Sequence, residues 1–307
     1  MIQLFKVPDY TIDTSKFKNL LHDDIKYETE QRIADYVGAK YCVGVSSCTA
    51  GIFLALKSLQ KKVMCVVPTL ITTRFLGSII HSGNDYMFTD NDLWVGHDYT
   101  LYVNENGLYF TIIDSAQRFD PGQFKEYNDN DLCVFSNYPT KPLGGMLGGF
   151  VVSNDKTKID WIRQAAYFGE NFNVDSWDAV PAFVGWQLYM TAPQAYFIDE
   201  SLKRYSEKRE RLDWVRNEYN KELQSVTNSS YHLYRVKVTN NRKMMQKLKE
   251  KGIMSGIHYK CAHKSRIYGK TGFYDKSLEA EGTVLSIPFH EDLTQRNIDD
   301  IIKLINL

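Results

Sequence analysis

The sequence predicts an α/β fold in which helices cover a mostly parallel sheet of about seven strands. Short apolar runs alternate with helix-like segments over the first part of the 307-residue chain, as in βαβ units. Most of these runs are apolar throughout, which is typical of strands buried on both faces of a parallel sheet. A strongly charged stretch then precedes a second set of elements, which predicts a small α+β domain at the C-terminal end.

The regular pattern begins with a helix, a strand and a second helix. Residues 28–37 place apolar side chains on one face, and Gly38 ends this helix. Residues 41–45 form an apolar run that predicts a buried strand. After the polar turn 46–49, apolar residues at helical spacing from Ile52 onward predict an amphipathic helix.

Six further apolar runs predict the other strands of the sheet. They lie at residues 63–67, 86–89, 99–103, 110–113, 132–135 and 150–152. Pro68 ends the first of these strands, and residues 71–80 then have the spacing of a helix. The stretch from 90 to 114 has room for a strand but not for a full intervening helix.

A change of composition near residue 195 divides the chain. We expect residues 1–195 to form a large domain, and residues 196–307 to form a connecting helix and a small domain. Residues 199–223 are highly charged and carry only a sparse apolar stripe, which predicts the connecting helix. The small domain is expected to contain two strands and a helix, at 232–238, 284–287 and 243–251.

The composition excludes several classes of function. Lys plus Arg and Asp plus Glu both total 37, so there is no net charge to attract nucleic acid or an anionic membrane. No run of about 18 apolar residues could span a bilayer, and the N-terminus lacks an apolar stretch of signal-peptide length. The five cysteines are odd in number and lack CxxC spacing, and the histidines lack metal-ligand spacing. We therefore expect a cytoplasmic protein that has no metal site and binds neither nucleic acid nor membrane.

Ligands of open α/β sheets bind beyond the carboxyl ends of the strands, so polar residues that follow apolar runs are the candidates for chemistry. The first candidate is the turn 46–50, where free backbone N–H groups before a helix would attract a phosphate. Ser and Thr are also ordinary helix caps, and for this turn alone capping is the simpler interpretation.

The second candidate is Asp114, which directly follows an apolar strand. A buried carboxylate needs a partner, and the protonated pyridine nitrogen of a cofactor would be one. An aspartate that only caps the following turn fits this position equally well.

The third candidate is Lys141, the single lysine in the turn-forming segment 135–145. Glycines in and after this segment leave space for close backbone approach, and Pro139 and Pro142 restrict the turn. Most lysines are solvated surface charges, but a lysine held in a rigid turn suits a Schiff-base role.

Together these positions resemble the DegT/DnrJ-type nucleotide-sugar aminotransferases, which are fold-type I pyridoxal-phosphate enzymes. The resemblance begins with EQRIADYVGAKYCVGVSSCT at 30–49 and continues with IDSAQ at 113–117 and FSNYPTKPLGGMLGGFVVSND at 135–155. It resumes with GIHYKCAH at 256–263 and LSIPFHEDLT at 285–294. The order of these motifs along the chain is more specific than any one motif.

The resemblance implies a homodimer that uses pyridoxal phosphate, with pyridoxamine phosphate as the intermediate form. Lys141 would form the Schiff base and move the proton, and Asp114 would pair with the pyridine nitrogen. The cofactor-binding residues would be Cys48, Thr49, Ala116, Gln117, Ser136 and Gln187. Of these, Gln117 would approach the ring hydroxyl and Gln187 would reach the phosphate in the partner subunit. The substrate-binding residues would be His258, His263 and Tyr138.

The chain also departs from the family pattern. Cys48 stands where the phosphate turn usually has glycine, and residues 69–73 lack the aromatic that stacks on the cofactor. Gln187 and Tyr189 stand where Asn and Arg are usual, and the stretch 90–114 is short. The N-terminal substrate segment is reduced too. These two shortened segments lie near the expected substrate cleft, so the accepted sugar or the reaction is expected to differ from the family norm.

The leading hypothesis for function is transamination, in which L-glutamate provides an amino group for a keto group on a nucleotide-linked deoxysugar. An aminocyclitol acceptor fits the same residues. A pyridoxamine-dependent sugar dehydratase uses the same scaffold but lacks the lysine, so Lys141 argues against it. A catalytically degenerate binding or regulatory protein is the remaining alternative.

Overall fold

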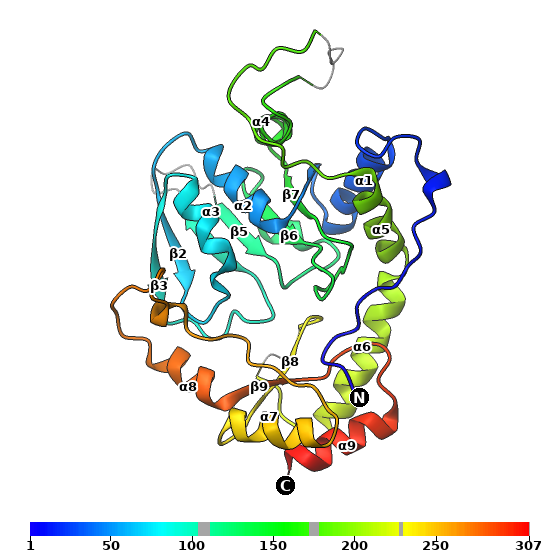
Figure 1. The fold of residues 1–307 in the computed structure, drawn as a ribbon, viewed down its shortest axis with the longest axis vertical. Helices are drawn as coiled ribbons and strands as arrows, with labels where there is room; N and C mark the ends of the chain where they lie inside the picture. The colour runs from blue at the N-terminus through cyan, green and yellow to red at the C-terminus, as the bar shows by residue number, and fades with distance from the viewer. Residues whose placement is uncertain (104–110, 172–177, 227–229, 307) are drawn as a thin grey trace.

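A larger α/β part and a smaller C-terminal part are joined by two consecutive helices in the computed structural model (Figure 1). The structure describes residues 1–103, 111–171, 178–226 and 230–306. Both ends of the chain lie beside the smaller part, and the N-terminal segment passes from there along α5 and α6 to the larger part (Figure 1). No helix in these described ranges has the length and apolar character needed to cross a bilayer.

The larger part contains the strands and helices that the sequence predicts, and one further helix at residues 156–166 that it did not predict. Its strands are β1 (Tyr41–Val45), β2 (Met64–Pro68), β3 (Asp85–Thr89), β4 (Tyr99–Val103), β5 (Thr111–Ser115), β6 (Leu132–Ser136) and β7 (Gly149–Ser153). Its helices are α1 (Ile25–Val37), α2 (Cys48–Lys57), α3 (Leu76–His81) and α4 (Lys156–Ala166). Within the described stretch between β3 and β5 no helix intervenes, as the short segment predicts.

The strands form a five-stranded sheet in the order β1-β7-β6-β5-β4 and a separate parallel pair, β2-β3. In the larger sheet β5 and β6 are parallel, whereas β7 is antiparallel to β1 and β6, and β4 is antiparallel to β5. The α/β class and the seven strands are confirmed, but the division into two sheets was not predicted. The link 104–110 is too short for a crossover, which needs a dozen or more residues, so β4 and β5 pair antiparallel.

Helices cover the five-stranded sheet on both faces. Val134 and Val151 point to one face, where they join Ile52 of α2 in a buried cluster. The next residues along these strands, Phe135 and Phe150, point to the other face. There they pack with α1 and with α5 (Ala192–Lys203), which contact each other. This alternation is the period of two expected for a sheet with two buried faces.

The connection is made of two helices, although the sequence predicts one long helix over 199–223. Helix α5 ends at Lys203, and α6 (Tyr205–Asn220) begins after Arg204, whose backbone is not helical. Thr191 and Gln194 form a capping box that starts α5. The predicted domain boundary at residue 195 therefore falls inside α5, and it stays a prediction.

The smaller part has the α+β composition that the sequence predicts. Strands β8 (Tyr234–Lys237) and β9 (Val284–Ile287) pair antiparallel, and helices α7 (Asn241–Glu250), α8 (Asp275–Thr283) and α9 (Gln295–Ile305) accompany them (Figure 1). Its core contains Val215 of α6, Leu285 of β9 and Ile298 of α9, all fully buried. Helix α6 therefore belongs to the core of the smaller part.

Candidate active site

Asp114 and Ser136 lie at the carboxyl ends of β5 and β6, the parallel pair at the centre of the larger part. Because the two strands run in the same direction, these ends lie at one edge of the sheet. Lys141 follows in the turn that leaves β6. We call Lys141, Asp114 and the first turn of α2 the Lys141 site.

The Lys141 turn is closed by short hydrogen bonds. The backbone N–H of Lys141 donates to the carbonyl of Tyr138 at 2.9 Å, and the Asn137 side-chain amide donates to the carbonyl of Leu143 at 3.0 Å. A Cβ at Gly144 would lie 2.4 Å from the carbonyl oxygen of Pro139, so only glycine fits there. The turn therefore holds the lysine backbone in one place.

Asp114 and Lys141 lie close enough for the charge of each to shift the pKa of the other. Burial raises the pKa of the Asp114 carboxyl, against the Ala116 N–H, the Tyr99 hydroxyl and Lys141. The Ala116 N–H donates to Oδ1 of Asp114 at 2.9 Å, and the Tyr99 hydroxyl donates to Oδ2 at 2.9 Å. Burial lowers the pKa of the Lys141 amine, against the opposing effects of Asp114 and Cys48. An amine with a lowered pKa is more often neutral at neutral pH and is a better nucleophile.

The first turn of α2 is built against β7. Ser47 caps the helix by accepting the N–H of Ala50 at 3.1 Å, so the capping interpretation of this turn is confirmed. A Cβ at Gly149 would lie 2.6 Å from the backbone nitrogen of Cys48, and Gly149 is also the register partner of Ser136. The predicted phosphate residues Cys48, Thr49 and Ser136 are thus brought together around Gly149. The Cys48 side chain is buried, whereas Thr49 is exposed.

His232 is a site residue that the sequence did not single out. It is only 4% exposed, and its Nδ1 lies 3.1 Å from Oε1 of Gln117, which also accepts the N–H of Gly96 at 3.0 Å. Burial lowers the pKa of His232 well below its ordinary value, and Lys141 lowers it further. The sequence offered one indication of this role, namely that His232 stands at the start of an apolar run. A polar side chain buried at the start of a strand needs a hydrogen-bond partner.

Aromatic residues that the sequence analysis did not single out as site residues lie near Asp114. Trp94 packs edge-on against Tyr99 with ring centroids 4.9 Å apart, and it stacks with Tyr259 at 6.2 Å. Its indole N–H donates to the carbonyl of Leu70 at 3.1 Å. Leu70 lies in the stretch after Pro68 that lacks the expected aromatic, so aromatic rings reach this region from other segments.

The three residues predicted to bind substrate lie in different surroundings. Burial lowers the pKa of His258 to about 3, with further lowering by the charges of Lys141 and Arg235. Because the charge of Lys141 reaches it, His258 belongs with the Lys141 site. Its Nδ1 lies 2.8 Å from the Ser286 hydroxyl. His263 instead contacts the Thr69 hydroxyl at 2.7 Å and packs on Tyr274. Tyr138 is 46% exposed, and its role and that of His263 stay predictions.

Residues 14–95 and 122–306 match the sequence model of the DegT/DnrJ/EryC1/StrS aminotransferase family. The chain belongs to this family. The match covers all the elements just described except β4 and β5, and it confirms the predicted aminotransferase class and the predicted pyridoxal-phosphate cofactor.

Known proteins of similar sequence or fold include sugar aminotransferases. The UDP-4-amino-4,6-dideoxy-N-acetyl-beta-L-altrosamine transaminase of Campylobacter jejuni is 22% identical over 88% of this chain and 86% of its own. The structure of the sugar aminotransferase CalS13 from Micromonospora echinospora superposes with a TM-score of 0.81 at 18% identity over 99% of both chains. The structure of NtdA from Bacillus subtilis with bound pyridoxamine phosphate has a TM-score of 0.77 at 17% identity, over 93% of this chain and 78% of that one. These likenesses confirm the fold.

The residues of this aminotransferase fit pyridoxal phosphate. An amine with a lowered pKa, a buried carboxylate and the N-terminus of α2 are the groups that its aldehyde, ring nitrogen and phosphate require. Because Gly149 has no Cβ, the first turn of α2 can lie close to β7 and to Ser136, although Cys48 stands where the family usually has glycine. Lys141 would hold the aldehyde carbon, Asp114 the ring nitrogen, and the backbone of Cys48 and Thr49 the phosphate.

Gln187 lies at the surface of its own chain. It is exposed, and its side-chain amide donates to the Tyr189 hydroxyl at 3.4 Å. Ala116 is half-buried and lies at the site, because its N–H donates a hydrogen bond to Asp114. The predicted contact of Gln187 with a partner subunit stays a prediction.

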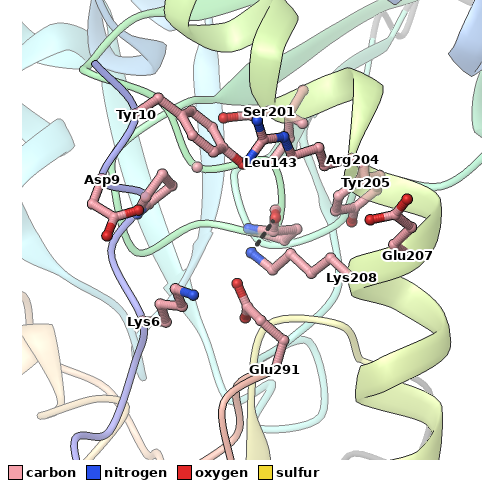
Figure 2. Close-up of a pocket in the computed structure, with 13 residues that line it drawn as sticks. Lys6, Asp9, Tyr10, Leu143, Ser201, Arg204, Tyr205, Glu207, Lys208 and Glu291 are labelled. Atoms are coloured by element: carbon pink, nitrogen blue, oxygen red, sulfur yellow. Dashed lines mark hydrogen bonds between the residues drawn. The ribbon is translucent and has the colours of Figure 1, made fainter.

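A cavity of about 280 Å³ borders the Lys141 turn on the side of α6 (Figure 2). Residues of the N-terminal segment, of the turn, of α5 and α6, and Glu291 line it. The Lys208 amine crosses this space to donate to the carbonyl of Pro142 at 2.9 Å. The turn that carries Lys141 is therefore also held from the α6 side.

Proposed function

We propose that this aminotransferase transfers an amino group from L-glutamate to a keto group on a nucleotide-linked deoxysugar. The observation that carries the proposal is the half-buried Lys141, whose amine has a lowered pKa and lies close enough to the Asp114 carboxylate for each charge to act on the other. The family description and the name of the Campylobacter relative support a sugar nucleotide as the acceptor.

The residues of the site have complementary tasks in such a reaction. When bound, pyridoxal phosphate supplies the electron sink that makes loss of a proton next to the amino carbon possible. Lys141 binds the cofactor and then moves this proton as the general base and acid, for which a lowered pKa is suited. Asp114 favours a protonated ring nitrogen, and Ala116 and Tyr99 hold its two carboxylate oxygens in place.

His258 would contribute as a neutral hydrogen-bonding group. With a pKa of about 3 it carries no charge at neutral pH. The Ser286 hydroxyl engages its Nδ1, which leaves Nε2 for a substrate group. A neutral imidazole close to Lys141 does not compete with the amine for the negative charge of Asp114.

The test is the absorbance spectrum of the purified protein with pyridoxal phosphate, before and after L-glutamate. We expect a visible band that is lost in Lys141→Ala and that bleaches when glutamate is added. Lys158→Ala is the matched control, because Lys158 is another lysine whose pKa burial lowers, and it should keep the band. A band that persists in Lys141→Ala would refute the role of Lys141.

The acceptor is tested separately with the form produced by glutamate. Nucleotide-linked keto-sugars should restore the original band, and keto-cyclitols should not. Restoration by keto-cyclitols alone would replace the sugar acceptor with an aminocyclitol acceptor, and no restoration by either class would contradict the second half-reaction.

We also propose a cytoplasmic homodimer. The exposed position of Gln187 leaves its amide available to a second copy, and the five cysteines are free and buried, as suits a reducing compartment. Light scattering should give twice the mass of 35.5 kDa. Mixing Lys141→Ala with Gln187→Ala subunits should restore part of the activity if the two residues serve one shared site, and a monomeric mass would refute the proposal.

A further inference from the structure

We propose that His232 is a positioning residue of the Lys141 site. Its imidazole, protonated at Nδ1, holds the side-chain amide of Gln117 in place by a hydrogen bond. The inference deepens the proposed function and rests on it for the cofactor readout, but its structural half is tested without cofactor.

The hydrogen bonds at Gln117 fix the proton of His232. The N–H of Gly96 donates to Oε1 of Gln117 at 3.0 Å, so this end of the amide is the oxygen. The same oxygen lies 3.1 Å from Nδ1 of His232. Because an amide oxygen only accepts, Nδ1 must carry the proton, and Nε2 keeps its lone pair.

The surroundings of His232 keep the ring neutral. Both His232 and Gln117 are at least nine-tenths buried, at 4% and 2% exposure. Phe5 of the N-terminal segment stacks on the imidazole at 5.5 Å with an interplanar angle of 17°. The titratable groups that act on the ring are Lys141, His258 and Lys208, and all three disfavour a second proton, whereas the Thr140 backbone favours it.

Gln117 connects His232 to the catalytic carboxylate. It is the residue after Ala116, whose N–H donates to Oδ1 of Asp114 at 2.9 Å. Gly96 and His232 both hold Oε1 of Gln117, so the orientation of the whole side-chain amide, including its Nε2 donors, is fixed. His232 lies just before β8, so one hydrogen bond ties the smaller part of the chain to the segment that carries Asp114.

Two substitutions separate the hydrogen bond from the loss of the ring. His232→Asn keeps an N–H donor near the position of Nδ1, whereas His232→Gln moves the donor to the position of Nε2. Both remove the stacking on Phe5 to the same extent, so they are matched for packing. We expect pyridoxal phosphate to bind about fivefold more weakly to His232→Gln than to His232→Asn, as for loss of one buried hydrogen bond.

The spectroscopic readout follows the pH dependence of the visible absorbance of the protein with pyridoxal phosphate. The midpoint should shift in His232→Gln and stay near that of the unchanged protein in His232→Asn, because only the glutamine variant releases Gln117 next to Asp114. Equal midpoints in the two variants would overturn the proposal. Thermal unfolding of both variants confirms that they are folded.

The tautomer is measured on the protein without added cofactor by NMR of ¹⁵N-labelled histidine. The signal of His232 is identified by its loss in His232→Asn. We expect a neutral ring protonated at Nδ1 from about pH 8 to about pH 5, below the ordinary histidine pKa. A proton on Nε2, or titration near pH 6.5, would overturn the proposal even if the Lys141 band is present. If that band is absent while the tautomer is as expected, the proposed function fails and the structural inference stands.

Discussion

The carboxylate of Asp114 shows how single residues set the chemistry of this site. It is 5% exposed, and both of its oxygens accept a hydrogen bond. One donor, the Ala116 N–H, comes from the same strand end and could be expected from the sequence. The other, Tyr99, comes from β4 across an antiparallel register in which the two residues are directly paired. No spacing along the chain indicates that pairing, so Tyr99 could not be predicted.

Replacement of Tyr99 by phenylalanine should make the acidic limb of the pH profile appear at higher pH. The Tyr99 hydroxyl lowers the pKa of Asp114, so its removal raises that pKa and the carboxylate is protonated at a higher pH. We expect kcat/KM at neutral pH to fall at least about tenfold, as for one lost hydrogen bond to a buried charge. Tyr86→Phe, which removes a hydroxyl bound to the Tyr268 carbonyl, is the control. An unchanged acidic limb would contradict this role.

His258 should make the protein less stable in mild acid. Its pKa is about 3 in the folded state, below the ordinary value near 6.5, so the unfolded chain takes up a proton that the folded chain does not. The free energy of unfolding therefore falls as the pH is lowered from about 6.5 toward 3. Urea unfolding between pH 8 and pH 5 measures this, and His258→Asn should reduce the loss. The same loss in the variant would mean that other groups cause it.

At the scale of elements, the sequence predicted where the strands lie but not which of them run antiparallel to their neighbours. Each strand of the larger part coincides with an apolar run. In β1, β5, β6 and β7 burial on both faces requires apolar side chains throughout, whereas β2 and β3 leave Met64, Val66 and Met87 exposed on one face. An apolar run has no direction, so the antiparallel placement of β4 and β7 depends on the lengths of the links and on packing. The break at Arg204 was missed because the charged stripe continues across it.

The same reasoning explains which site residues were predictable. Asp114 and Ser136 directly follow apolar runs, and Lys141 lies in a turn rich in glycine and proline, so local pattern was enough. His232 lies far along the chain from Gln117, and Trp94 lies far from Tyr259. Their places depend on how the smaller part and the segment before β4 pack against the sheet.

The close approach of α2 to β7 predicts a severe effect of alanine at Gly149. The added Cβ would lie 2.6 Å from the nitrogen of Cys48 and 2.7 Å from the oxygen of Phe135, both backbone atoms. The first turn of α2 must then move, at a cost of about 1–3 kcal/mol in the free energy of unfolding. Gly282→Ala in α8 meets nothing within 4 Å and should be neutral or stabilising, because alanine favours a helix more than glycine does. Urea unfolding and pyridoxal-phosphate titration of both variants check this, and equal stability of the two would refute it.

At the scale of the whole molecule, the Lys141 turn is enclosed from several parts of the chain. The N-terminal segment reaches the smaller part, where Ile2 bridges to Ile253 and Lys6 pairs with Asp292 at 2.9 Å. Together with α6 it surrounds the cavity beside the turn (Figure 2). The Lys141 turn thus lies where the two parts of the chain meet, and its position depends on both.

Lys208 makes a direct link from α6 to the Lys141 turn, and its loss should loosen the turn. Its amine donates to the carbonyl of Pro142, the residue after Lys141, and burial lowers its pKa while Glu291 opposes this shift. In Lys208→Met the carbonyl loses its donor and the apolar stem is largely kept, so the fold should persist. We expect faster amide hydrogen exchange in residues 137–145 and about fivefold weaker binding of pyridoxal phosphate. Lys221→Met, beyond the far end of α6 and paired only with Glu218 among the described side chains, should change neither. If both variants exchange like the unchanged protein, the turn is rigid by its own hydrogen bonds, and the junction only covers it.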